Sequence, residues 1–169
     1  MLKRLLKNQK GLTLIELLAV VIILGIVSAI AVPSIGKIID NSKKDAHVAN
    51  AVQMINSTKL LIAGGDATLR PSNGSQVYIP LNYLVGASGN LDALKNPDGG
   101  TYNSPTADVV STSAVPTGSY VKVSLAASPA TEFTYDVKLV PSSGRGVQTG
   151  SPSAGNPIAE ANLTRSAVN

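Results

Sequence analysis

The sequence predicts an α+β protein in which a long N-terminal helix packs on a small, antiparallel, β-rich C-terminal domain. A basic segment is followed by an unbroken apolar run, helix-forming residues continue beyond it, and later segments alternate between polar and apolar residues. These observations divide the chain into a leader at residues 1–11, a helix at 12–63 and a β-rich domain at 64–141. A tail rich in Gly, Ser and Pro follows at residues 142–169. Residues 12–32 form the half of the helix expected to span a membrane.

Charge is distributed unevenly along the chain. The 169 residues include 14 Lys or Arg and 10 Asp or Glu, for a formal net charge of +4. The excess lies at the N-terminus, where Lys3, Arg4, Lys7 and Lys10 have no acidic neighbour; the rest of the chain is balanced. The basic residues therefore flank the apolar run on its cytoplasmic side and do not indicate a nucleic-acid surface.

The apolar run at residues 12–32 contains Thr13, Glu16 and Ser28 as its polar members and is long enough to cross a bilayer. It fits a plain membrane anchor, a signal peptide removed near residues 28–31, or a segment exposed by cleavage after Gly11. Placing an acid near a bilayer centre costs roughly 2.5–3.5 kcal/mol. Neither a plain anchor nor a signal peptide explains why Glu16 is present despite this cost. Cleavage after Gly11 gives Leu12 an ammonium group four residues from Glu16, on the same helix face.

Residues 10–16, Lys-Gly-Leu-Thr-Leu-Ile-Glu, resemble the processing signature of type IV prepilins and pseudopilins. The resemblance implies that a prepilin peptidase cleaves after Gly11 and that Leu12 becomes the N-methylated first residue. Most members of the family have Phe at this position, so Leu12 is an apolar departure. Gly11 and Glu16 stand where the family has them. An amine on the same chain or on a neighbouring chain would neutralise the Glu16 carboxylate, and the cost of leaving it unpaired would favour subunits docked at one register.

Gly25 and Pro33 weaken the predicted helix. Glycine favours helix poorly, and the ring of Pro33 crowds the carbonyl group of Ala29 while removing a backbone donor. Alternatively, Gly25 is a packing residue, and Pro33 marks the position at which the helix leaves the membrane. In filaments of the family, the backbone between the matching residues can extend, which implies flexibility at residues 25–33.

The second half of the predicted helix, residues 34–63, ends at Gly64 and Gly65. Its apolar residues follow two stripes, one with Ile35, Ile38, Ile39, Ala46 and Ala49, the other with Val48, Val52, Ile55 and Ile62. The stripes predict either two packing partners or one broad core face.

The pattern after residue 65 predicts a short strand at 77–79, a helical turn near 91–94 and a turn at 96–100. Strands are expected at 119–125 and 132–140, joined by a hairpin connection at 126–131. The second has an inward set and an outward set: Phe133, Tyr135, Val137 and Leu139 inward, Thr134, Asp136 and Lys138 outward. The tail is expected either to lie along the domain or to be partly disordered.

The sequence contains no catalytic constellation, and we expect neither an enzyme nor a cofactor or metal site. His47 is the only histidine and is expected at the surface or in a subunit contact; there is no cysteine. Some pseudopilins bind calcium in a similar region, but Asp92, Asp98 and Asp108 match no defined calcium loop. We expect Asp98 and Gly99 to form a turn.

The resemblance implies a type IV pilin: a single-pass precursor in the cytoplasmic membrane and, after processing, a subunit of an extracellular helical homopolymer. Its partners would be the prepilin peptidase, the assembly platform protein and ATPase, and other copies of itself, with no small-molecule substrate. Adhesion, motility or DNA uptake would be the role of the filament. The alternatives are a pseudopilin of a type II secretion or competence machine and, from a different class, a membrane-anchored binding domain. Many Gram-negative pilins close a C-terminal loop with a disulfide, so the absence of cysteine favours a Gram-positive origin.

Overall fold

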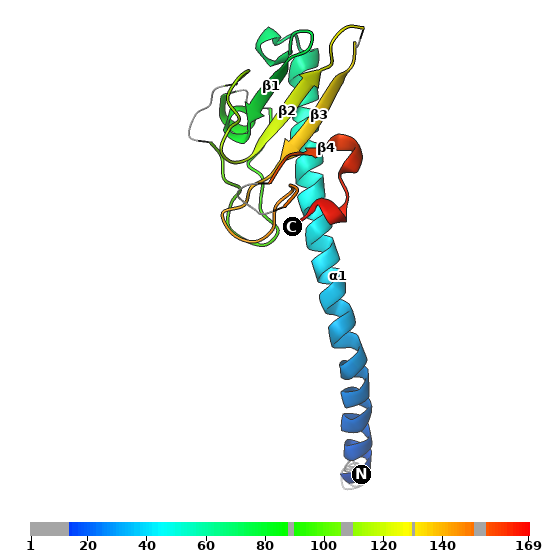
Figure 1. The fold of residues 1–169 in the computed structure, drawn as a ribbon. Helices are drawn as coiled ribbons and strands as arrows, with labels where there is room; N and C mark the ends of the chain where they lie inside the picture. The colour runs from blue at the N-terminus through cyan, green and yellow to red at the C-terminus, as the bar shows by residue number, and fades with distance from the viewer. Residues whose placement is uncertain (1–13, 88–89, 106–109, 130, 151–154) are drawn as a thin grey trace, which may run out of the picture. The chain divides into compact units, whose positions relative to one another are not determined.

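The computed structural model describes residues 14–87, 90–105, 110–129, 131–150 and 155–169. The chain divides into two units, Met1–Asp40 and Asn41–Asn169. The second unit contains a four-stranded sheet and the part of the helix that covers it, shown in Figure 1. The predicted α+β class is confirmed.

Helix α1 comprises Leu14–Ala63 and includes Pro33. It ends at the predicted glycine pair. The Gly64 amide donates to Leu60 O at 2.9 Å and the Gly65 amide to Ile62 O at 3.2 Å. Gly65 has a φ of 92°, which glycine adopts without the strain that a side chain would cause.

Within the second unit, one face of α1 is buried under the sheet. Its buried side chains recur at helical spacing: His47, Ala51, Met54, Ile55, Ser57, Thr58 and Ile62. Ile55 and Ile62 belong to the second predicted stripe, whereas Val52 of the same stripe is 37% exposed. The core face is thus built from small, polar and apolar residues together.

The sheet contains β1 (Gln76–Pro80), β2 (Tyr120–Leu125), β3 (Phe133–Lys138) and β4 (Ile158–Ala159). All neighbours are antiparallel, in the order β1-β2-β3-β4. The strands predicted at 77–79, 119–125 and 132–140 and the hairpin connection between the last two are confirmed. The helical turn predicted near 91–94 is wrong: the amide of Leu91 bonds to Leu84 O at 3.1 Å and its side chain enters the core, while a π-helical turn forms at Tyr83–Ala87.

The inner face of the sheet forms the main core with α1. Val77, Ile79, Val121, Val123 and Val137 are at most 1% exposed and belong to one cluster with Ala51, Met54 and Ile55. Burial of such aliphatic side chains contributes about 1.5–3 kcal/mol each, which explains why the alternating residues of β2 and β3 predicted this face.

The outer face carries Tyr78, Tyr120 and Lys138. The two tyrosine rings meet edge to face with centroids 5.5 Å apart. Lys138 lies on the outward face, opposite Val137, as predicted, yet it is only 8% exposed. The outward face is therefore not open to solvent at this point, since loop segments at 103–104, 115–118 and 155–156 line the same hollow as Lys138.

The described part of the C-terminal tail is built into the domain. β4 pairs with β3 through Val137 and Ile158, and Val147 forms bridges with both Leu139 and Val168. Val147 and Val168 are buried. Of the two expectations for the tail, the one that places it on the domain holds for residues 142–150 and 155–169.

Candidate functional site

The first half of α1 presents an apolar surface. Its large hydrophobic side chains between residues 14 and 32 are 51–83% exposed. Among the residues that the structure describes, α1 is the one helix long and apolar enough to cross a membrane. Apolar exposure on this scale marks a membrane or protein contact.

Glu16 lies on this surface in the first turn of α1 and is exposed. A carboxylate at this end of a helix interacts favourably with the helix dipole. Glu16 is also the only charged residue of the sequence between residues 14 and 36. The two residues of the expected cleavage junction, Gly11 and Leu12, lie outside the described residues.

Gly25 and Pro33 both lie inside α1, which is helical from one to the other. A Cβ atom added at Gly25 would meet nothing within 4 Å, so no contact within this chain requires glycine there. Pro33 leaves the helix one backbone hydrogen bond short. The segment at 25–33 is therefore helical here, with two residues that reduce the cost of unwinding it.

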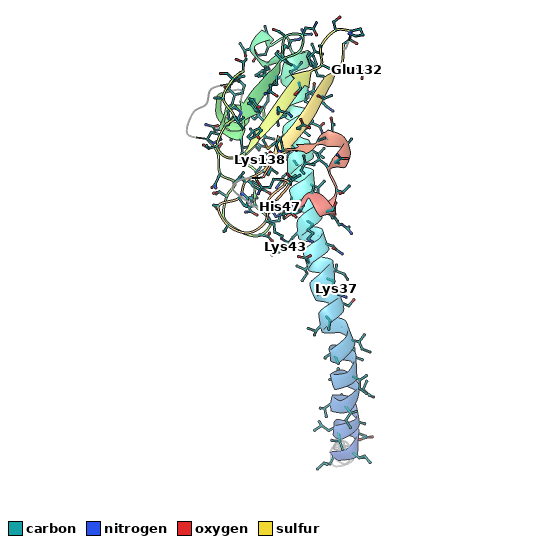
Figure 2. The ribbon with its side chains drawn as sticks, viewed as in Figure 1. Lys37, Lys43, His47, Glu132 and Lys138 are labelled. Atoms are coloured by element: carbon teal, nitrogen blue, oxygen red, sulfur yellow. The ribbon has the colours of Figure 1, made fainter. Side chains whose placement is uncertain are left out.

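A second site, which we name the His47 cluster, joins α1 to two segments of the domain. It consists of Lys43, His47 and Asn50 from α1, Asp98 and Tyr102 from the loop after the π-helical turn, and Arg145 from the C-terminal segment. Lys43 and His47 are one helical turn apart, as Figure 2 shows.

His47 is fully buried, so the expectation that it lies at the surface or in a subunit contact is wrong. Tyr102 Oη lies 2.7 Å from His47 Nδ1, and His47 Nε2 lies 3.3 Å from Asp98 Oδ2. Asn50 Nδ2 donates to Tyr102 Oη at 3.0 Å. A neutral ring protonated on Nε2 satisfies all three contacts, since Tyr102 then donates to Nδ1 and Nε2 donates to Asp98.

Asp98 is the acidic centre of the His47 cluster. Arg145 donates to it from Nε and Nη2, each at 2.8 Å, and from its backbone amide at 3.2 Å. Lys43 Nζ lies 3.5 Å from the same carboxylate. Hydrogen bonds from Arg145 hold the pKa of Asp98 well below its usual range.

Local backbone geometry supports this ion pair. The Asp98 amide donates to Asn96 Oδ1 at 2.9 Å, which confirms the predicted turn at 96–100. Gly144 has a φ of 79°, and a Cβ added there would lie 2.7 Å from Asp98 Cβ. Glycine before Arg145 therefore lets the C-terminal segment approach the turn closely.

The electrostatics of the His47 cluster fit a structural role. Burial lowers the pKa of His47, and burial raises the pKa of Tyr102 to about 12, so both groups are neutral near neutral pH. A fully buried imidazole has no route to a substrate. Within the described part of the chain, no group of three potential ligands is placed to hold a metal ion; Asp108 lies outside it.

Sequence reasoning missed most of the His47 cluster. Asp98 and Arg145 are separated by 47 residues, and only the folded chain brings them together. A signal did exist for His47: its spacing to Ala51 and Met54 places it on the buried face of α1.

The comparisons with known proteins give one match. Residues 6–32 match the family model described as the prokaryotic N-terminal methylation motif. This segment contains Gly11, Leu12, Glu16 and Gly25. Comparisons with curated proteins and with solved structures found no match. The N-terminal segment is thus similar to the class III signal peptide of type IV pilins and pseudopilins, and the chain is pilin-like in this motif and in its α+β fold.

Proposed function

We propose that this chain is the structural subunit of a type IV pilus filament. A prepilin peptidase cleaves the precursor after Gly11 and methylates Leu12 while the apolar half of α1 lies in the cytoplasmic membrane. The assembly platform protein and its ATPase then move the subunit into a helical homopolymer on the cell surface. In this proposal the chain has no catalytic role.

The methylation motif followed directly by an exposed apolar helix carries the proposal. Burying apolar surface contributes roughly 25 cal/mol per Å², so exposed side chains along residues 14–32 need lipid before assembly and other subunits afterwards. A filament core of bundled helices provides the second environment. The domain at 41–169 has its own core and would form the outer layer.

Glu16 is the residue that we assign to assembly. In an apolar bundle its carboxylate would be stabilised by the Leu12 ammonium of an adjacent subunit. Removing one partner of a buried ion pair costs roughly 3–5 kcal/mol, so a wrong register is penalised. Extension of residues 25–33 during assembly would adjust the length of the helix.

Filament preparation tests this function. Cells that express the chain are sheared, and the released material is examined by electron microscopy and immunoblotting. Long surface filaments built from this subunit would support a pilin. Processed subunits that stay in the cell envelope, with no long filament, would instead indicate a pseudopilin of a secretion or DNA-uptake machine. We also propose a Gram-positive origin, which the absence of cysteine favours, so the chain is expressed in a Gram-positive host.

A further inference from the structure

Asn73 and Gly74 form the corner of a tight turn directly before β1 (Figure 1). The Ser75 amide donates to Ser72 O at 2.9 Å, which closes the turn. Gly74 has a φ of 73°, whereas none of the described residues other than glycine has a positive φ. These features define a type II turn with asparagine and glycine at its two central positions.

The side-chain amide of Asn73 and the backbone amide of Gly74 are open to solvent. Both residues are exposed. Neither amide has a hydrogen-bond partner among the described residues, since the bond that closes the turn uses the amide of Ser75. A bond between the Gly74 nitrogen and the Asn73 side-chain carbonyl carbon would close a five-membered ring. The two reacting groups are therefore adjacent and unhindered.

Glycine at position 74 favours this ring closure. It has no Cβ to block the approach of its nitrogen to the side-chain carbonyl carbon of Asn73. Ring closure also requires the peptide unit between the two residues to rotate, and glycine accepts this rotation because its φ can take either sign. A Cβ built at Gly74 would come no closer than 3.8 Å to Ala127 Cβ, so the neighbouring chain leaves the turn room to rearrange.

The other asparagines lack this combination of features. Asn73 is the only asparagine of the sequence that is followed by glycine. Asn90 and Asn162 are also exposed, but each is followed by a leucine whose amide donates to a backbone carbonyl, at 3.1 and 3.3 Å. Asn96 and Asn156 precede prolines, which have no amide hydrogen. The reaction should therefore be selective for Asn73.

We propose that Asn73 is a site of spontaneous conversion to aspartate and isoaspartate. The Gly74 nitrogen, after losing its proton to solvent, attacks the side-chain carbonyl carbon of Asn73 and forms a succinimide. The bond from this carbon to Nδ2 breaks, and ammonia leaves with a proton taken from solvent. Water then opens the ring: addition at the side-chain carbonyl gives aspartate, and addition at the backbone carbonyl gives isoaspartate.

Either product adds one negative charge to the turn, and isoaspartate also lengthens the backbone before β1 by one methylene group. The proposal does not depend on the function proposed above. The turn belongs to the unit at 41–169, and the reaction needs neither cleavage of the leader nor assembly of a filament.

Peptide mass spectrometry of the full chain, incubated in detergent micelles, tests this proposal. Isoaspartate is the diagnostic product, since direct hydrolysis of the side-chain amide gives only aspartate. We expect both products at Asn73, formed faster at mildly alkaline than at mildly acidic pH because the attacking nitrogen must lose its proton. Their rate of formation should be at least about ten-fold higher than at Asn90 and Asn162. Absence of isoaspartate at residue 73, or equal rates at the three asparagines, would overturn the proposal.

Two glycine variants test the role of Gly74. Gly74→Ala hinders the attacking nitrogen and should slow isoaspartate formation at Asn73 at least about ten-fold. Gly86→Ala makes the same change at an exposed glycine where an added Cβ would meet nothing within 4 Å, and it should leave the rate unchanged. The comparison of the three asparagines uses the wild-type chain, so it remains valid if Gly74→Ala fails to fold. A wild-type rate in folded Gly74→Ala would contradict the proposal.

Discussion

Arg145 and Asp98 form a bidentate ion pair with both N–O distances at 2.8 Å, linking the C-terminal segment to the turn at 96–100. The Asp98 side chain is only 11% exposed, so the pair is largely shielded from water. His47 of α1 reaches the same carboxylate. This one acidic group therefore connects three segments that are distant in sequence.

Arg145→Met should destabilise the domain by about 1.5–3 kcal/mol, because Asp98 would lose its strongest charged donors while remaining shielded. Denaturant unfolding of the full chain in micelles, followed by circular dichroism, measures the change. Arg165→Met is the matched control: its ion pair with Asp45 is more than half exposed at both ends, so water screens it and the loss of stability should be much smaller. Equal losses in the two variants would contradict the assignment of Asp98 as a structural centre.

Acidification should weaken the domain through His47. Because burial lowers its pKa below 6.5, the unfolded chain takes up a proton first, and stability falls as the pH drops through this range. Asp98, Arg145, Lys43 and Tyr102 face the ring, and the carboxylate opposes the shift only in part. The unfolding midpoint should therefore decrease between about pH 7 and about pH 5.

His47→Gln tests the source of this dependence. The variant loses packing and should be less stable at neutral pH, but its midpoint should change less over the same interval. A pH profile as steep as that of the wild type would show that another group titrates.

Periodicity predicted the elements whose residues alternate or recur regularly. Alternation predicts the strand containing Val121 and Val123 and the one containing Phe133 and Val137, whereas the end of α1 is predicted by the glycine pair that follows Ala63. Periodicity does not show what covers a face. The alternation therefore predicts the face on which Lys138 lies, but not that loop residues 115–118 line the same hollow as this lysine.

The sequence also does not show how closely the C-terminal segment packs on the domain, for a related reason. Its Gly, Ser and Pro content resembles that of a disordered tail, but Val147, Ile158 and Val168 are buried and Leu163 is partly buried. Gly146 lets this segment pass close to the residues that follow β3, since a Cβ there would meet Leu139 O and would lie 2.7 Å from Pro141 Cδ. Composition averages over such single positions, so the contacts of this segment could not be predicted.

Glu16→Ala should leave membrane insertion intact or improved, because an expensive charge is removed. Cleavage after Gly11 should persist, while the amount of sheared filament should fall sharply, since the Leu12 ammonium loses its proposed partner. Glu16→Gln keeps the shape without the charge and should also assemble poorly. Immunoblots of sheared and cell-bound fractions provide the measurement.

Glu132→Gln serves as the control for Glu16, since it removes an exposed acid from the globular unit and should not affect filament yield. If Glu16→Ala and wild-type cells release equal amounts of filament, the acid has a role other than assembly.

Pro33→Ala should make residues 25–33 harder to unwind. It restores one helical hydrogen bond and removes a residue that costs about 3 kcal/mol in a helix interior. Cryo-electron microscopy of wild-type filaments should show this segment extended, with more helix retained in Pro33→Ala filaments. A fully helical segment in the wild-type filament would contradict the assignment of Gly25 and Pro33.

Mass spectrometry of the surface-released subunit tests the central claim most directly. The account predicts a mature chain that begins at Leu12 and carries one N-methyl group, and it predicts that Gly11→Val leaves the leader attached. A released subunit with an intact leader, or one that begins near Ala31 as after signal-peptide removal, would contradict it.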